Sequence, residues 1–261
     1  TRNLTMKQHE LDAVISKVPQ VTLLFWGIKI LATTFGETAG DALSMSLNIG
    51  YLLSTFIFAL IFFAFVIVQI RAKSYHPYLY WFTIIASTTV GTTLADFVDR
   101  SLGIGYLGGS TLLLSLVLLT LFAWHKVEGS ISPHIVQPRA ELFYWLTITF
   151  SQTLGTALGD WSSDTAGLGY TGGILLYVAL LFIVIVLYLF TKTSRVMLFW
   201  TAFVLTRPLG AVIGDFLDKP ISHGGLDLSR FGASAVLLAA IFFCIAVANY
   251  RTRRLNEISG L

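Results

Sequence analysis

Residues 145–160 read WLTITFSQTLGTALGD, and three other stretches of the chain share their pattern. The other copies are WGIKILATTFGETAGD at 26–41, WFTIIASTTVGTTLAD at 81–96 and WTAFVLTRPLGAVIGD at 200–215. Each copy begins with a tryptophan and continues, at fixed spacing, with a glycine, a second small residue and an aspartate. Copies one and two recur as copies three and four at one constant offset, which predicts two halves of two repeats.

The composition around these copies is that of a membrane protein. Of the 261 residues 55% are hydrophobic and 12% charged, whereas soluble domains carry about 25% charged residues. A membrane helix needs about 20 apolar residues, so the chain has room for about eight spans and no extramembrane domain. Apolar runs place the spans at 19–45, 50–70, 77–99, 105–125, 140–161, 170–191, 196–217 and 231–250. Unbroken runs such as Leu60–Val68 favour helices over barrel strands.

The predicted fold is therefore an all-α integral membrane protein with eight transmembrane helices in two pseudo-symmetric halves. One transmembrane domain, 19–250, lies between an N-terminal segment 1–18 and a tail 251–261. Its repeats cover about 19–71, 77–126, 140–192 and 196–250. Twelve basic residues fall in the termini and in alternate loops, against three in the opposite loops, so we expect both termini in the cytoplasm. This distribution argues against nucleic-acid binding.

The four copies resemble a bacterial membrane-protein family of four tandem two-span repeats, each with a tryptophan, known as a repeat of unknown function. The resemblance rests on Trp26 with residues 36–41 and on the matching residues of the other copies, and it covers nearly the whole chain. It implies the same fold and a location in the bacterial inner membrane. It implies no activity.

The repeat aspartates are the main candidates for function. Two spans per repeat make every copy enter the membrane from the same side, so Asp41, Asp96, Asp160 and Asp215 should lie at similar depth, toward the outer leaflet. An acid within the membrane usually marks a pathway or a paired site. Solvated caps at the outer interface, copied by duplication, are the alternative.

Oxygen-bearing side chains accumulate beside these acids. Glu37 precedes Asp41 by one helical turn, and Thr92 and Thr156 hold the matching positions in copies two and three. With no Cys or His in this pattern, the oxygen atoms suit hard cations or protons. The predicted metal ligands are Glu37, Asp41, Asp96, Asp160 and Asp215, with Thr92 and Thr156 beside them. Thr34, Thr89 and Thr153 add hydroxyls that we expect to face the interior.

Lys29 and Arg207 are the two cations within predicted spans, and neither is repeated. A cation in the membrane normally needs a carboxylate partner, for which Glu37 and the repeat aspartates are available. The pair either locks the two halves together or competes with a substrate cation for those carboxylates.

The remaining polar and small residues have plainer interpretations. We expect the repeat glycines to be helix-packing contacts and the repeat tryptophans to be anchors at the membrane interface. Asp99 with Arg100, and Asp218 with Lys219, are expected to form exposed pairs at the rim.

The leading functional hypothesis is a transporter for a hard divalent metal cation, manganese or magnesium, coupled to protons if the cation displaces a proton from Glu37. This hypothesis predicts no catalysis and no cofactor. The predicted partners are the lipid bilayer and the metal cation or proton, and the sequence leaves self-association open. An anion carrier using Lys29 and Arg207 is opposed by the surrounding carboxylates. The Gly159-Asp160 and Gly214-Asp215 dipeptides leave an intramembrane aspartyl hydrolase as an alternative. A non-catalytic scaffold or sensor is the other.

Overall fold

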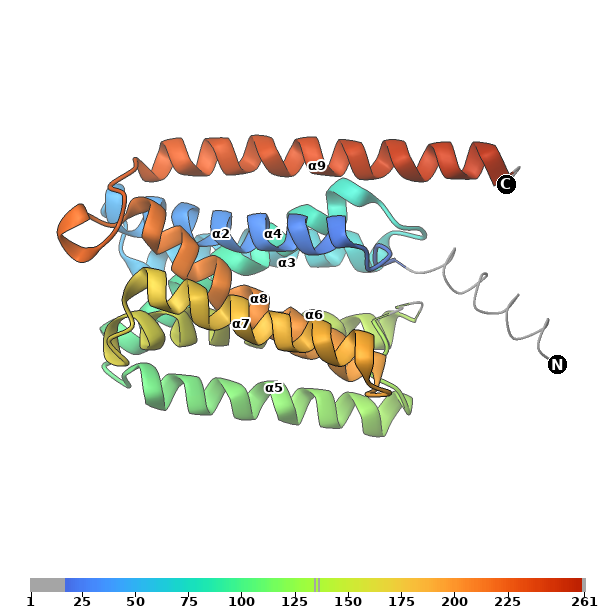
Figure 1. Ribbon diagram of the computed structural model, residues 1–261, viewed down its shortest axis with the longest axis horizontal. Helices are drawn as coiled ribbons and strands as arrows, with labels where there is room; N and C mark the ends of the chain where they lie inside the picture. Colours follow the sequence, from blue (N-terminus) through green and yellow to red (C-terminus); the bar gives the residue numbers. More distant parts are fainter. Residues whose placement is uncertain (1–16, 134, 136, 260–261) are drawn as a thin grey trace.

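The computed structural model describes residues 17–133, 135 and 137–259, which form eight α-helices and no strand (Figure 1). The helices are α2 Leu23–Asp41, α3 Tyr51–Arg71, α4 Pro77–Asp96, α5 Tyr106–Glu128, α6 Pro138–Asp160, α7 Gly169–Phe190, α8 Arg195–Asp218 and α9 Arg230–Ser259. The prediction of an all-α fold with eight helices is confirmed. Because α9 continues through Ser259, most of the predicted tail 251–261 is helical. The predicted N-terminal segment 1–18 lies outside the described residues except for 17 and 18.

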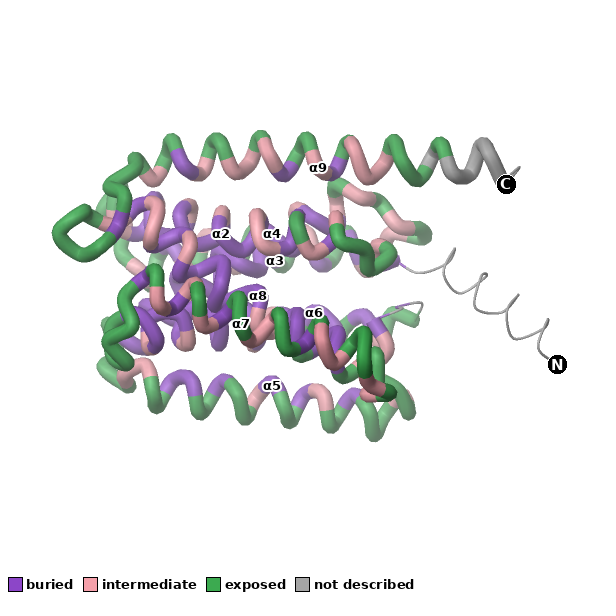
Figure 2. The backbone as a smooth tube through the Cα atoms, viewed as in Figure 1, coloured by how far each residue is buried: buried purple, intermediate pink, exposed green. Residues whose placement is uncertain are grey.

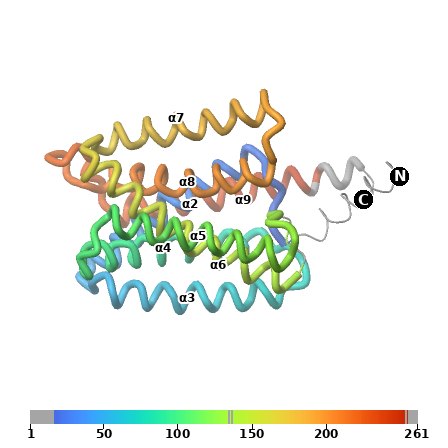
Figure 3. Tube along the Cα trace, turned by 90° about the horizontal axis from the view of Figure 1, so that it is seen from below, coloured from blue at the N-terminus to red at the C-terminus, as the bar shows by residue number. Residues whose placement is uncertain are grey.

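The first helix of each repeat belongs to an inner ring. Helices α2, α4, α6 and α8 each pack against the next, and α8 packs back against α2. The second helices lie outside this ring: α5 and α9 are on opposite sides in Figure 1, and α3 and α7 are at the two other sides in Figure 3. Figure 2 shows the inner helices mostly buried and the outer helices exposed along much of their length.

Each outer helix packs against the inner helix of the following repeat. Helix α3 packs on α4, α5 on α6, α7 on α8, and α9 closes the circle on α2. Thr38 and Ser234, whose hydroxyl oxygens are 2.8 Å apart, join α2 to α9. The four repeats therefore form one closed unit.

Helix position explains the hydropathy of each segment. Five helices, α3, α5, α7, α8 and α9, are long and apolar enough to cross a membrane. They include all four outer helices, whose exposed apolar surfaces suit contact with lipid. The inner helices α2, α4 and α6 face mainly other helices, so they carry more Thr, Gly and acidic residues.

Repeat glycines hold the inner ring together by close contacts between neighbouring helices. A methyl group added at Gly36 would overlap Thr88, and one at Gly91 would lie 2.8 Å from the backbone carbon of Gln152. The same contact recurs between Gly155 and Arg207 and between Gly210 and Thr33. Each glycine thus meets the residue three positions before the glycine of the next copy.

The tryptophans close the end of the ring where α2 begins and α9 ends, which we call the aromatic end. Trp81, Trp145 and Trp200 are buried in the largest hydrophobic cluster, and Trp26 is half-buried. The expectation that the repeat tryptophans anchor the membrane interface is therefore wrong for three of them. Trp200 also donates a 2.8 Å hydrogen bond to the carbonyl of Ile131.

The opposite end, where the repeat aspartates lie, is the carboxylate end. In the first three copies a short π-helix follows the aspartate: η1 Ala42–Ser46, η2 Phe97–Ser101 and η3 Trp161–Thr165. Two residues with positive φ then turn the chain into the outer helix; they are Asn48 and Gly50, Gly103 and Gly105, and Gly167 and Gly169. The fourth copy has a longer connection containing the 3-10 helix η4 Ile221–His223, and α9 begins only at Arg230.

Candidate ion-binding site

Each inner helix buries a stripe of side chains spaced four residues apart. A turn takes 3.6 residues, so each step of four residues advances about 40° beyond a full turn, and the stripe winds gradually around its helix. Residues at matching positions of the four stripes form five buried layers, one residue from each inner helix in each layer. From the aromatic to the carboxylate end, the first layer is Phe25, Tyr80, Tyr144 and Phe199; the second is Lys29, Ile84, Ile148 and Phe203; the third is Thr33, Thr88, Gln152 and Arg207; the fourth is Glu37, Thr92, Thr156 and Ala211; and the fifth is Asp41, Asp96, Asp160 and Asp215. Within the first layer, the Tyr80 and Tyr144 hydroxyls are 2.6 Å apart.

The fifth layer contains the four repeat aspartates, each at most 3% exposed. They end α2, α4 and α6 and occupy the last turn of α8. None faces lipid. The structure thus places four carboxylates in one buried layer, where each needs a cation or a hydrogen-bond donor.

Two cations bridge these aspartates in pairs. Arg100 lies 3.1 Å from Asp96 and 3.2 Å from Asp160, and Lys219 contacts Asp41 and lies 3.1 Å from Asp215. Each cation comes four residues after the aspartate of an even-numbered copy and reaches the aspartate of the next copy. The even copies thus supply both bridges, which makes the arrangement pseudo-twofold.

The prediction of exposed rim pairs at Asp99–Arg100 and Asp218–Lys219 is wrong. Asp99 and Asp218 are each 6% exposed, and the neighbouring cations point to the aspartate layer. The four-residue spacing from Asp96 to Arg100 and from Asp215 to Lys219, one helical turn, is the signal that could have revealed both bridges.

On the side of the aspartates that faces the aromatic end, Arg207 forms the centre of the third and fourth layers. Its guanidinium donates to Glu37 at 3.0 Å, to Thr92 at 2.6 Å and to Thr156 at 2.5 Å. The Thr92 hydroxyl also lies 3.2 Å from the Glu37 carboxylate. Arg207 and Glu37 are both almost fully buried. The guanidinium of α8 thus joins this helix to the other three inner helices, α2, α4 and α6.

Lys29 has no carboxylate partner among the described residues, contrary to its predicted role. Its Nζ is buried, lacks a hydrogen-bond partner and lies 4.2 Å from the centre of the Phe203 ring in the same layer. Thr34, Thr89 and Thr153 are buried, as expected, but their hydroxyls bond carbonyls of their own helices. Among the predicted hydroxyls, only Thr92 and Thr156 join the charged groups.

Asp218 and Asp99 occupy equivalent positions but have different surroundings. Arg230 donates to Asp218 at 2.7 Å, because the longer connection of copy four brings the start of α9 back to the end of α8. Asp99 lies in η2 against Gly109, and neither of its oxygens has a hydrogen-bond partner within the described structure. Burial raises the pKa of Asp99 to about 6, with Arg100 opposing the shift.

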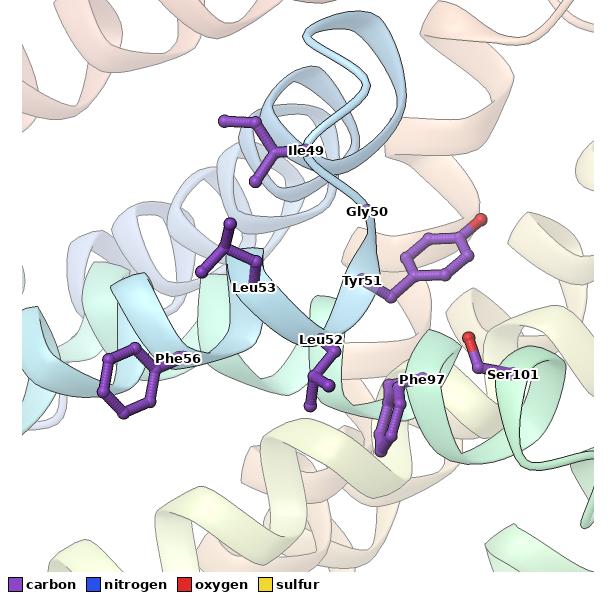
Figure 4. Close-up of a pocket in the computed structure, with 8 residues that line it drawn as sticks. All are labelled: Ile49, Gly50, Tyr51, Leu52, Leu53, Phe56, Phe97 and Ser101. Carbon is purple, nitrogen blue, oxygen red and sulfur yellow. The ribbon is translucent and has the colours of Figure 1, made fainter.

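A hollow of about 590 Å³ lies beside the aspartate layer, between the start of α3 and η2. Figure 4 shows Tyr51 and Ser101 toward one side and Ile49, Leu53 and Phe56 toward the other. The Tyr51 hydroxyl is 3.4 Å from Arg100, so this ring stands between the hollow and the charged groups. The mainly apolar lining offers no set of ligands for a cation.

The fold and this buried charge layer define a multi-pass α-helical membrane protein with a polar interior. Four matches to the family model "Repeat of Unknown Function (DUF347)" cover residues 24–75, 79–130, 143–194 and 198–254. The chain therefore belongs to this repeat family, as the sequence predicts. Neither the curated proteins nor the solved structures contain a match to the chain.

Proposed function

We propose that the protein transports a hard divalent metal cation across the membrane, with manganese and magnesium as the first ions to test. The observation that supports this proposal most directly is the layer of four buried aspartates inside the ring. Carboxylate oxygens are the preferred ligands of such ions. Carboxylates buried inside a membrane bundle are costly unless cations neutralise them.

The charge balance of the carboxylate end also favours a cation. Seven buried acids lie there beside four cations; the acids are Glu37, Asp41, Asp96, Asp99, Asp160, Asp215 and Asp218, and the cations are Arg100, Arg207, Lys219 and Arg230. The excess of carboxylates attracts cations and repels anions. An anion carrier is disfavoured for the same reason.

The hydrolase alternative has less support from the geometry. An aspartyl dyad needs two carboxyl groups that share a proton. Here Asp96 and Asp160 are joined through Arg100, and Asp41 and Asp215 through Lys219. Cation-bridged carboxylates are better suited to exchanging one cation for another.

The test is ion flux into vesicles reconstituted with the purified protein. We expect saturable entry of Mn²⁺ or Mg²⁺, reduced at least tenfold by Asp41→Asn and unchanged by Asp164→Asn, a matched change at an exposed acid near the same end. Failure of the folded wild-type protein to move Mn²⁺, Mg²⁺ or Ca²⁺ would overturn the proposal.

Proton coupling requires a separate measurement. If Glu37 exchanges its proton with the transported cation, Glu37→Gln should abolish flux or make it independent of pH. Because Glu37 pairs with Arg207, the variant is best compared with Glu37→Gln/Arg207→Gln, which removes both charges. Unchanged flux and pH dependence in both variants would refute a role of Glu37 in coupling.

A further inference from the structure

Three carboxylates at the carboxylate end converge on a single lysine. Lys219 Nζ contacts Asp41 and lies 3.1 Å from Asp215 Oδ1 and 3.9 Å from Asp218 Oδ1. One oxygen from each of the three acids lies within 4.8 Å of the others, which is close enough for a shared metal ion. Among the described residues this is the only such group. Of the predicted ligands it includes Asp41 and Asp215 but not Asp96, Asp160 or Glu37.

Asp218 adds an independent sign of a missing ligand. Its side chain is 1% exposed, and its Oδ1, the oxygen that faces Lys219, has no hydrogen-bond partner in the described part of the chain. Its other oxygen is held by Arg230. A buried carboxylate oxygen without a donor is costly, so a cation closer than 3.9 Å would stabilise it.

From these contacts we infer that Asp41, Asp215 and Asp218 form the divalent cation site and that the Lys219 ammonium occupies it as a tethered competitor when the metal is absent. The ion class rests on the proposed function. The metal replaces the ammonium between the same oxygens, and the lysine side chain withdraws. Water molecules fill the remaining coordination positions, as is usual for magnesium.

The charges favour a divalent ion in this exchange. Three carboxylates and Arg230 together carry two negative charges. Lys219 neutralises one of them, and a divalent cation neutralises both. The site also has a route to the surface, because the Lys219 and Arg230 side chains are 13% and 21% exposed whereas the three acids are almost fully buried.

The equivalent group in the other half is held by a different kind of cation. Arg100 bonds Asp96 and Asp160 and also meets the hydroxyls of Tyr106 at 3.1 Å and Tyr51 at 3.4 Å. A planar guanidinium with several fixed partners resists displacement, whereas an ammonium is a compact charge on a flexible stem. The Arg100 guanidinium therefore stays between its two aspartates, whereas the Lys219 ammonium is exchanged for a metal cation.

The test is Mn²⁺ binding to the purified full chain in detergent, followed by calorimetry and by the electron spin resonance of the bound ion. Lys219→Gln removes the competitor and should tighten binding at least tenfold. Lys219→Arg replaces it with a cation that is harder to displace and should weaken binding. Asp218→Asn should weaken binding at least tenfold, and Lys192→Gln, at an exposed lysine, should leave it unchanged.

These results separate the site from the transport function. Binding that responds to Lys219 and Asp218 in a protein without flux supports the site and contradicts the proposed function. Flux together with binding that is unchanged in Lys219→Gln, Lys219→Arg and Asp218→Asn, each shown to be folded by its melting temperature, overturns the site and leaves the function standing. Absence of Mn²⁺ binding in both the wild type and a folded Lys219→Gln variant overturns the site as well.

Discussion

A single departure from the repeat places a guanidinium at the centre of the ring. At the position three residues before the repeat glycine, the first three copies carry Thr33, Thr88 and Gln152, and the fourth carries Arg207. The next layer toward the carboxylate end contains Glu37, which is the only acid at its repeat position. The two unrepeated residues pair with each other at 3.0 Å. The repeats thus build a symmetric frame, and single residues make its interior asymmetric.

The Glu37–Arg207 pair should be strongly coupled in stability. Glu37→Gln alone leaves a buried guanidinium without its carboxylate, a change that costs about 3–5 kcal/mol. Arg207→Gln should cost a similar amount, and the double variant should cost clearly less than the sum of the two. Chemical unfolding in detergent measures all three free energies. Additive costs would show that the two charges do not depend on each other.

Asp99 should make stability depend on pH. Its folded-state pKa of about 6 lies above the ordinary value of 3.8, so the folded state binds the proton more tightly than the unfolded state. Stability is therefore greatest below about pH 4 for this group and falls as pH rises toward 6. Asp99→Asn should flatten the dependence of melting temperature on pH between 4 and 6.5, and Asp164→Asn should not. An unchanged profile in Asp99→Asn would contradict the prediction.

At the scale of the helices, glycine sets the distance between neighbours in the inner ring. The contacts of Gly36, Gly91, Gly155 and Gly210 follow the circle of helices in one direction and close on themselves. Close approach of this kind replaces the hydrophobic effect as a source of stability where helices meet inside a membrane. The ring should therefore tolerate no added volume at these positions.

Two glycine variants test this packing. In Gly91→Ala the new methyl would lie 2.8 Å from the Gln152 backbone, and overpacking of this kind costs about 1–3 kcal/mol. Gly27 has nothing within 4 Å of such a methyl, so Gly27→Ala should stabilise α2 by about 0.5–1 kcal/mol. Unfolding free energies of both variants check the expected opposite signs. Equal effects would argue against tight packing at Gly91.

At the scale of the whole molecule, the exchange of outer helices makes the four repeats interdependent. Each inner helix is covered by the outer helix of the preceding repeat, and α9 of the last repeat covers α2 of the first. A lone repeat would leave its inner helix uncovered. The closed circle also brings the start of α2 and the end of α9 to the same end of the bundle (Figure 1).

The orientation in the membrane remains a prediction that labelling can test. The basic loops predict a cytoplasmic aromatic end and an external carboxylate end. In a Cys244→Ser background, a membrane-impermeant maleimide added to intact cells should label Leu102→Cys, which follows η2, and should not label Thr193→Cys, which lies between α7 and α8. Both should react after lysis. The reverse pattern in intact cells would invert the orientation.

The sequence alone determined the repeat, the number and approximate limits of the helices and the common depth of Asp41, Asp96, Asp160 and Asp215. These features follow from local composition and from the fixed rise of a helix, which are properties of each segment.

Only the tertiary structure decided which helices are neighbours and which charges meet. Glu37 joins Arg207, Asp41 joins Lys219, and Asp160 joins Arg100, although each pair is far apart in the chain. The sequence therefore singled out Glu37 and the four aspartates, which the structure buries in adjacent layers, but missed Arg100, Lys219 and Asp218 as their buried or bridging neighbours. Such pairings depend on how each helix is rotated and packed against its neighbours, because side chains reach only a few ångströms from their own helix.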